Sequence, residues 1–183
     1  MIVTIHQPDF LPWLGFFDRW SKSDLYIVLD DVQFIRRGWH HRDKIKTKDG
    51  PRWLTVPVIK KGRYVQLVRD VEIDNSTEWR ENHLKTIEYN YRDAVNFAGC
   101  FRGIKNIYQK NHSLLIDLNM EFLNWAALEL GISTPVLFAS DKQIETSSSQ
   151  RLVDLAKSVG ASQYLVGQGS KDYLDESAFG KEG

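Results

Sequence analysis

Three side chains suited to acid–base chemistry, together with a glutamine, follow two apolar runs near the start of the chain. His6 and Gln7 come directly after the first run, and Asp30 and Asp31 come directly after the second. A neutral histidine can take a proton from an amine near pH 7, and a neighbouring carboxylate such as Asp30 can orient its ring. We therefore predict catalytic roles for His6, Asp30 and Asp31, and a substrate-binding role for Gln7. In the alternative interpretation, the histidine fills a strand end and the aspartates form a turn.

The two apolar runs have the composition of buried strands. Residues 2–5 are largely apolar and β-branched, and residues 25–29 form a second apolar run, which favours strands. Pro8 and Pro12 interrupt the chain after the first run, and a short helix can begin at Leu14. A strand, a short helix and a second strand form a right-handed βαβ unit with parallel strands. Ligands bind beyond the carboxyl ends of such strands, where the four polar side chains are expected.

The last third of the chain repeats the strand–helix–strand pattern. Residues 135–139 and 163–166 predict strands, and the second leads into Gly167-Gln-Gly-Ser-Lys171. Backbone N–H groups in such a loop can form an anion-binding nest, to which a lysine adds charge. We predict that substrate is bound here by Gly167, Gly169 and Lys171. The alternative is a turn that enters a helix from Lys171 and needs glycine for its backbone conformation.

The middle of the chain has the spacing of helices. Helices are predicted over about 75–89, 94–110 and 113–130, and in the last of these Leu115, Leu118, Phe122 and Trp125 recur at helical spacing. The motif Asn75-Ser-Thr-Glu78 has the spacing of a capping box, and so does Ser147-x-x-Gln150 before the last predicted helix. We expect both motifs to cap the helices that follow them.

Positive charge gathers in one segment of a chain whose formal net charge is zero. Between Arg36 and Arg69, eleven Lys and Arg residues face two Asp residues, a local excess of nine positive charges. Strands at 44–47 and 52–58 flank Asp49-Gly50, a strong hairpin signal, and 64–73 predicts a third strand. We expect this antiparallel insertion to form a basic flap that closes one side of the cleft at the strand ends.

The basic flap predicts a ligand that carries phosphate. Arginine binds phosphate through paired hydrogen bonds, and tryptophan stacks on bases and sugars. The predicted ligand is a nucleotide-linked sugar or another phosphate-bearing small molecule, while zero net charge argues against nucleic acid as the partner. The alternative is a solvated charged face. The substrate-binding residues predicted outside the strand ends are Trp13, Arg36, Arg37, Trp39, Arg42 and Lys44.

Several motifs resemble the WbqC-like protein family, in the expected order over nearly the whole chain. These motifs are Ile5-His-Gln-Pro-Asp-Phe-Leu-Pro-Trp-Leu-Gly-Phe-Phe17, Leu29-Asp-Asp-Val-Gln-Phe34, Trp39 with Arg42 and Lys44, Trp53-Leu-Thr-Val-Pro-Val58 and Tyr164-Leu-Val-Gly167. The resemblance implies a transferase that acts on a nucleotide-activated amino sugar in bacterial O-antigen (lipopolysaccharide) biosynthesis, with glycine transfer to an amine as the suggested reaction. The other hypothesis is a non-catalytic module that binds a nucleotide or sugar and acts with a partner protein. The family pattern continues past Phe179 with a strand and a tail, so we expect the chain to lack that tail.

The sequence also argues against several kinds of site and segment. Cys100 is the one cysteine, which excludes an intramolecular disulfide and a cysteine-based zinc cluster, and its apolar neighbours predict a buried side chain. His40 and His41 are adjacent, so in a strand their rings face opposite sides, and we predict no metal site. The glycine fingerprint of a dinucleotide site is absent, and the residues point to no particular cofactor. Neither a secretory signal nor an apolar run that could span a membrane occurs, which favours the cytoplasm.

These observations predict the architecture. The length favours a single domain over 1–183. The fold class is α/β: a three-layer Rossmann-like parallel sheet with an inserted antiparallel β flap and a helical middle.

Overall fold

The computed structural model describes residues 1–167, 169 and 174–180. The chain forms two compact units. The sheet unit comprises Met1–Gln7, Trp13–Asp31 and Ala127–Gly183, and the hairpin unit comprises Pro8–Pro12 and Val32–Ala126. The single domain over 1–183 stays a prediction.

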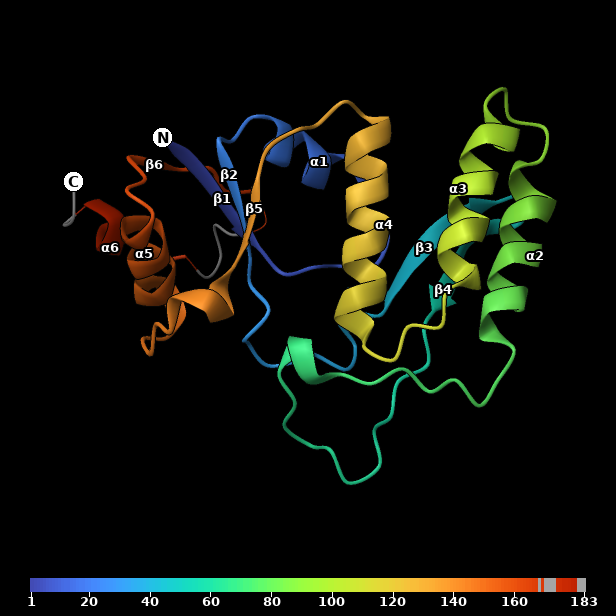
Figure 1. The fold of residues 1–183 in the computed structure, drawn as a ribbon, viewed down its shortest axis with the longest axis horizontal. Helices are drawn as coiled ribbons and strands as arrows, with labels where there is room; N and C mark the ends of the chain where they lie inside the picture. The colour runs from blue at the N-terminus through green and yellow to red at the C-terminus, as the bar shows by residue number, and fades with distance from the viewer. Residues whose placement is uncertain (168, 170–173, 181–183) are drawn as a thin grey trace. The chain divides into compact units, whose positions relative to one another are not determined.

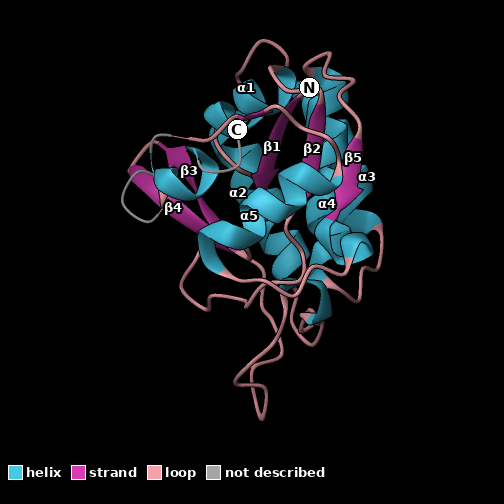
Figure 2. Ribbon diagram, turned by 90° about the vertical axis from the view of Figure 1, so that its left-hand side faces the viewer, coloured by secondary structure: helices cyan, strands magenta, loops and turns pink. Residues whose placement is uncertain are grey.

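A parallel sheet forms the centre of the sheet unit. Within the described residues it has four strands in the order β5–β2–β1–β6, and every pair is parallel. Figure 2 shows β1, β2 and β5 side by side. The predicted pairing of the two N-terminal runs is therefore confirmed, with His6 opposite Val28. The strands are β1 (Ile2–His6), β2 (Leu25–Val28), β5 (Val136–Phe138) and β6 (Gln163–Tyr164).

Helices cover both faces of this sheet because its side chains alternate. The sheet unit contains α1 (Leu14–Ser21), α5 (Ser148–Ser158) and α6 (Glu176–Gly180). Val3 and Ile27 are fully buried in a cluster with Leu155 of α5. On the other face, the ring of Tyr26 lies 4.8 Å from that of Trp20 in α1. Figure 1 shows α1 and α5 beside these strands, which confirms the three-layer arrangement.

The hairpin unit contains the predicted antiparallel insertion. The two strands β3 (Arg42–Thr47) and β4 (Gly50–Thr55) pair with Thr47 opposite Gly50, which leaves Lys48 and Asp49 as a two-residue turn. Gly50 has φ +104°, a conformation that side-chain-bearing residues rarely adopt. Strand β4 ends before Pro57, as the missing N–H of proline requires.

The predicted third strand at 64–73 is wrong. A 3-10 turn occupies Val68–Asp70. On either side of it, single bridges join Leu67 to Gln33, Glu72 to Leu114 and Ile73 to Val58. Because these partners come from different parts of the unit, no continuous ladder forms and the segment stays irregular.

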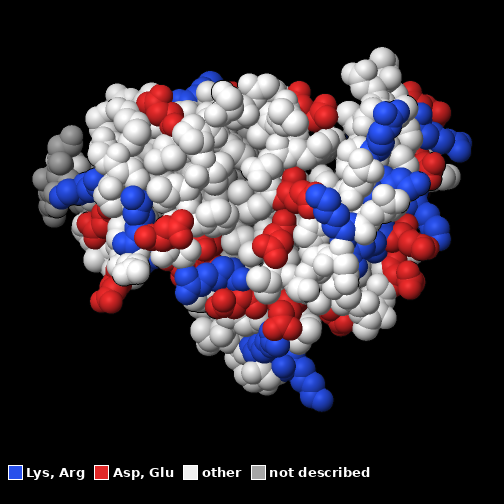
Figure 3. All heavy atoms as spheres, in the orientation of Figure 1, with Lys and Arg blue, Asp and Glu red and all other residues white. Residues whose placement is uncertain are grey.

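Three helices follow the insertion: α2 (Trp79–Tyr91), α3 (Phe97–Gln109) and α4 (Leu115–Glu129). Figure 1 shows α2 and α3 side by side, and Figure 3 shows basic and acidic side chains interspersed over them on the face drawn. The apolar face of α3 includes Phe97, Phe101, Ile104 and Tyr108, which pack into the core of the hairpin unit. The predicted burial of Cys100 is wrong, because it lies beside this stripe and is exposed.

Neither predicted capping box forms. Glu78 is itself the N-cap residue of α2, so that helix begins later than predicted, and no side chain caps it. Before α5, the N-cap Ser147 makes no side-chain cap bond, while Gln150 donates to Asp154 at 2.9 Å. The glutamine therefore stabilises the helix surface and leaves the helix entry uncapped.

No helix in the described ranges combines the length and the apolar character needed to cross a bilayer.

Candidate functional site

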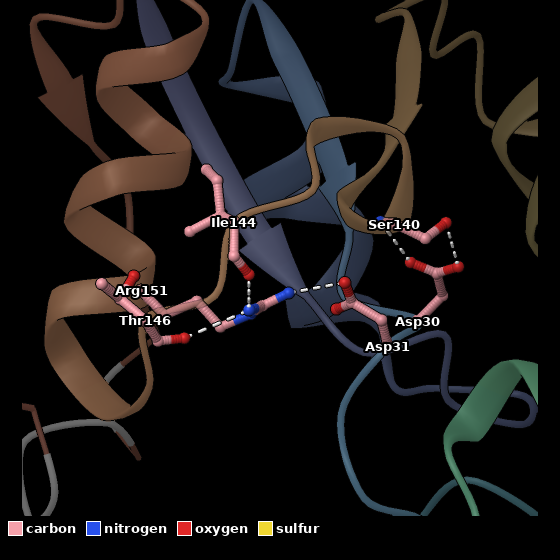
Figure 4. A network of polar contacts seen from close by, with 6 residues as sticks. All are labelled: Asp30, Asp31, Ser140, Ile144, Thr146 and Arg151. Carbon is pink, nitrogen blue, oxygen red and sulfur yellow. Dashed lines mark hydrogen bonds and ion pairs between the residues drawn. The ribbon is translucent and has the colours of Figure 1, made fainter.

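The carboxyl edge of the sheet unit carries a network of polar contacts, drawn in Figure 4. Asp30 follows β2 and is 3% exposed. One of its carboxylate oxygens accepts the backbone N–H of Ser140 at 3.0 Å, and the other accepts the Ser140 hydroxyl at 2.7 Å. Since Ser140 follows β5, this carboxylate fixes the ends of two neighbouring strands to each other.

Asp31 forms a second contact with a residue far away in the sequence. Its Oδ2 lies 2.5 Å from Nη2 of Arg151, and the two side chains are 12% and 13% exposed. Arg151 belongs to α5 and also donates to the carbonyls of Ile144 and Thr146. The guanidinium thus ties the end of β2 to the loop that enters α5 (Figure 4). Asp31 Oδ1 and Arg151 Nε are buried, with no hydrogen-bond partner in the described part of the chain.

His6 lies at the same edge but is held by other groups. Its Nδ1 lies 2.9 Å from the carbonyl oxygen of Gln7, so the neutral ring carries its proton on Nδ1. The ring meets Phe16 edge to face at 5.2 Å between centroids. The hypothesis that Asp30 orients His6 is wrong, because both carboxylate oxygens of Asp30 are directed to Ser140.

The surroundings of His6 keep its ring neutral. Burial lowers its pKa from 6.5 to about 4; the hydrogen bond to the Gln7 carbonyl opposes this shift, and the positive charge of Arg19 adds to it. One flank of the ring borders a space too narrow for a water molecule, which is lined by Thr4, His6, Phe16, Arg19, Trp20 and Tyr26. Such a ring can take part in hydrogen bonds at pH 7, but it is a weak base there.

Gly167 lies at the same edge, past the end of β6. The N–H of Leu165 donates to the carbonyl of Val3 at 2.8 Å, which continues the pairing with β1. The guanidinium of Arg19 lies directly against Gly167. Gly169 is exposed, and Lys171 lies outside the described residues.

Trp13 is exposed at the start of α1. Its side chain is 74% exposed, and its ring covers Gly15 so closely that a β-carbon at position 15 would collide with the indole. A planar side chain held in this way offers one open face to solvent.

The hairpin unit places aromatic and cationic side chains together on one surface. The rings of Trp39 and Trp53 are 5.5 Å apart, and both side chains are exposed. Arg42 lies over the Trp53 ring at 4.4 Å and Lys44 at 4.9 Å. We call these four residues the ribbon face, because Lys44 and Trp53 are directly opposite each other in the two-stranded ribbon.

The other two predicted arginines have different contacts. Arg36 donates to the carbonyl of Arg63 at 3.0 Å and lies 5.4 Å from the Tyr64 ring. Arg37 supports the ribbon face through its backbone, since its carbonyl accepts a hydrogen bond from Arg42 at 2.7 Å. Both arginine side chains are exposed.

Four residues that contribute to these sites have no role in the sequence-based prediction: Arg19, Trp53, Ser140 and Arg151. Trp53 could have been found from the hairpin signal, because the turn at Lys48 and Asp49 places it opposite Lys44. The other three carry no local signal. Ser140 and Arg151 reach their aspartate partners across 110 and 120 residues of sequence.

Comparison with known proteins identifies the family. The sequence model of the WbqC-like protein family matches residues 7–183. The chain belongs to the WbqC-like protein family. It is also 36% identical over 178 residues to "Uncharacterized protein Rv1507c" of Mycobacterium tuberculosis, a match that covers 97% of this chain and 77% of that protein. No solved structure matches.

The ion pair at the sheet edge of this WbqC-like protein should contribute strongly to its stability. We expect Arg151→Met to lower the free energy of unfolding by about 3 kcal/mol, because it leaves the Asp31 carboxylate buried and unpaired. Lys22→Met is the matched control, since Lys22 pairs with Asp18 on the surface and should contribute about 1 kcal/mol or less. Urea unfolding followed by circular dichroism measures both. Equal, small losses of unfolding free energy in the two variants would show that the Asp31 carboxylate does not need Arg151 as its partner.

The lowered pKa of His6 predicts a pH dependence for the WbqC-like fold. In the folded protein the ring should titrate at about pH 4, and in urea near its ordinary value of 6.5. Between these values the unfolded state binds more protons, so the His6 contribution lowers stability as the pH falls through this window. NMR of the His6 ring protons against pH measures the titration in both states. A folded-state midpoint near 6.5 would contradict the burial of the ring.

Proposed function

We propose that this WbqC-like protein binds a nucleotide-linked amino sugar, or another phosphate-bearing small molecule, through the ribbon face. One observation carries the proposal: Trp39 and Trp53 are exposed and adjacent, with two cations directly beside them. Exposed indoles provide a stacking surface for a base or a sugar ring. The cations provide positive charge for a phosphate next to that ring.

The cations of the ribbon face are available to a ligand. Among the residues described, neither Arg42 nor Lys44 forms an ion pair with Asp or Glu. Asp43 lies between them in sequence, and alternation along β3 turns it to the other side of the ribbon. Within the described residues, no ion pair with an acidic side chain therefore neutralises Arg42 or Lys44.

Arg42 is also held in position before a ligand arrives. It is half-buried, it lies over Trp53 and it donates to the carbonyl of Arg37. A guanidinium fixed by these contacts loses less conformational entropy on binding than a free side chain does.

We further propose that the reaction is aminoacyl transfer, in which glycine is transferred to the amine of the sugar during surface polysaccharide (O-antigen) biosynthesis. Membership of the WbqC-like family supports this proposal. In such a step the amine nitrogen attacks the acyl carbonyl carbon, a C–N bond forms and the bond to the donor's leaving group breaks. In the sheet unit, His6 with Gln7 beside it is the group that would accept a hydrogen bond or proton from an attacking amine. The amine must arrive unprotonated, since a ring with a pKa of about 4 cannot deprotonate an ammonium efficiently.

The second candidate is a non-catalytic module that binds a nucleotide or sugar and acts with a partner protein. The contacts of Asp30 and Asp31 favour this candidate. Asp30 has both oxygens directed to Ser140, and Asp31 is paired with Arg151, so neither carboxylate is positioned as a general base. In both candidates, these aspartates hold the strand ends in place.

If the ligand binds at the ribbon face, mutation of this face should selectively weaken ligand binding. We expect Arg42→Ala with Lys44→Ala to weaken binding of a UDP-linked amino sugar by about tenfold or more at low salt, because two charge-assisted contacts are lost. Arg102→Ala with Lys105→Ala is the matched control, since it removes one Arg and one Lys from exposed positions of α3. Titration followed by tryptophan fluorescence measures both affinities. An equal effect of the two double variants would overturn the proposed site.

Product formation separates the two candidates. We expect mass spectrometry to detect glycyl-amino-sugar product when the protein is incubated with the UDP-linked amino sugar and activated glycine, either a thioester or glycyl-tRNA. His6→Gln should lower kcat by about 100-fold and leave KM nearly unchanged, if the ring receives the proton. If the sugar binds but neither donor gives product, the transferase hypothesis is rejected and the non-catalytic binding module is supported.

A further inference from the structure

Among the residues that the structure describes, no acidic side chain pairs with the guanidinium of Arg19. This residue lies in α1, within the described part of the molecule. Its one hydrogen bond there runs from Nε to the carbonyl of Gly15 over 3.4 Å, which is long. The remaining four N–H donors, on Nη1 and Nη2, have no acceptor among the described groups.

The guanidinium is nevertheless held in place. A β-carbon built on Gly167 would lie 3.2 Å from Nη1, 3.3 Å from Cζ and 3.5 Å from Nε of Arg19. Because these three distances are nearly equal, the plane of the guanidinium faces the position that a β-carbon of residue 167 would occupy. The ring of Phe16 lies 6.0 Å from Cζ, and Arg19 is half-buried. These contacts restrain the guanidinium of Arg19, whereas an arginine that extends into solvent is mobile.

This contact gives a reason for glycine at position 167. Gly167 is not among the glycines with positive φ, so its backbone conformation does not demand glycine. A side chain at this position would press on the guanidinium instead. Glycine at position 167 therefore leaves room for the guanidinium of Arg19.

The position of Arg19 is one where α/β proteins bind ligands. Gly167 follows β6, His6 ends β1, and Arg19 lines the narrow space beside His6. All of these groups lie at the carboxyl edge of parallel strands, beyond which ligands of such folds are bound. The positive charge of Arg19 reaches this edge, since it contributes to the low pKa of His6.

We propose that Arg19, held against Gly167, binds an oxyanion at the carboxyl edge of the sheet unit. The ligand class is a phosphate or a carboxylate, a group whose negative charge is shared by two or more oxygens. The planar guanidinium can bind two of these oxygens through two parallel hydrogen bonds. The proposal rests on residues of the sheet unit alone and does not depend on the function proposed for the ribbon face.

The test is an NMR titration of the full chain labelled with nitrogen-15. Sodium phosphate is added in one series and sodium acetate in another, with ionic strength held constant by sodium chloride. We expect saturable shifts of the Arg19 Nε–H and Gly167 N–H signals with at least one of these anions. The series in which they saturate assigns phosphate or carboxylate as the ligand class. Shifts that stay linear in both series would overturn the proposal.

Variants distinguish a specific anion-binding site from general electrostatic attraction. Arg19→Gln should weaken binding, read at the Gly167 N–H, by about tenfold or more. Gly167→Ala keeps the charge but displaces the guanidinium, and it should also weaken binding, read at the Arg19 Nε–H. Lys22→Gln, which removes the positive charge of the residue directly after the same helix, should leave the affinity unchanged. Equal weakening by Arg19→Gln and Lys22→Gln, in variants whose spectra remain folded, would overturn the proposal.

Discussion

The parallel pairing of β1 with β2 is the constraint on which the sheet unit depends. The register places His6 opposite Val28, and the N–H of Leu29 donates to the carbonyl of His6 at 2.9 Å. Since both strands end at the same edge, the polar residues that follow them are brought together. The same pairing sets the alternation that buries Ile27 towards α5 and Tyr26 towards α1.

The polar groups at this edge differ in what they can do chemically. The two aspartates are held by Ser140, which follows β5, and by Arg151 of α5, so their charges stabilise the strand ends. His6 is kept neutral by burial, and Arg19 forms no ion pair with an acidic side chain that the structure describes. This edge thus combines fixed carboxylates, a neutral imidazole and an available cation. Such a combination is better suited to binding an anionic ligand than to strong acid–base catalysis.

The hairpin unit presents a different kind of surface. Strand alternation directs Arg42 and Lys44 to the side of Trp53, while Leu54 is buried in the core of the unit. The two-residue turn fixes this register, because one residue of slip would exchange the two faces of the ribbon. The position of Trp53 beside the cations therefore follows from the turn at Lys48 and Asp49.

The sequence by itself determined the elements whose cause is local. Apolar β-branched runs specified β1 and β2, and Asp49-Gly50 with Pro57 specified a hairpin and its end. The candidate residues at the strand ends could be predicted from these elements, because parallel strands end at one edge. Only the tertiary structure decided what those residues contact. Arg151 pairs with Asp31, Ser140 with Asp30 and Arg19 with Gly167, and each pair joins elements that are distant in sequence. Such contacts depend on how helices pack on the sheet, which the periodicity of a short segment does not encode.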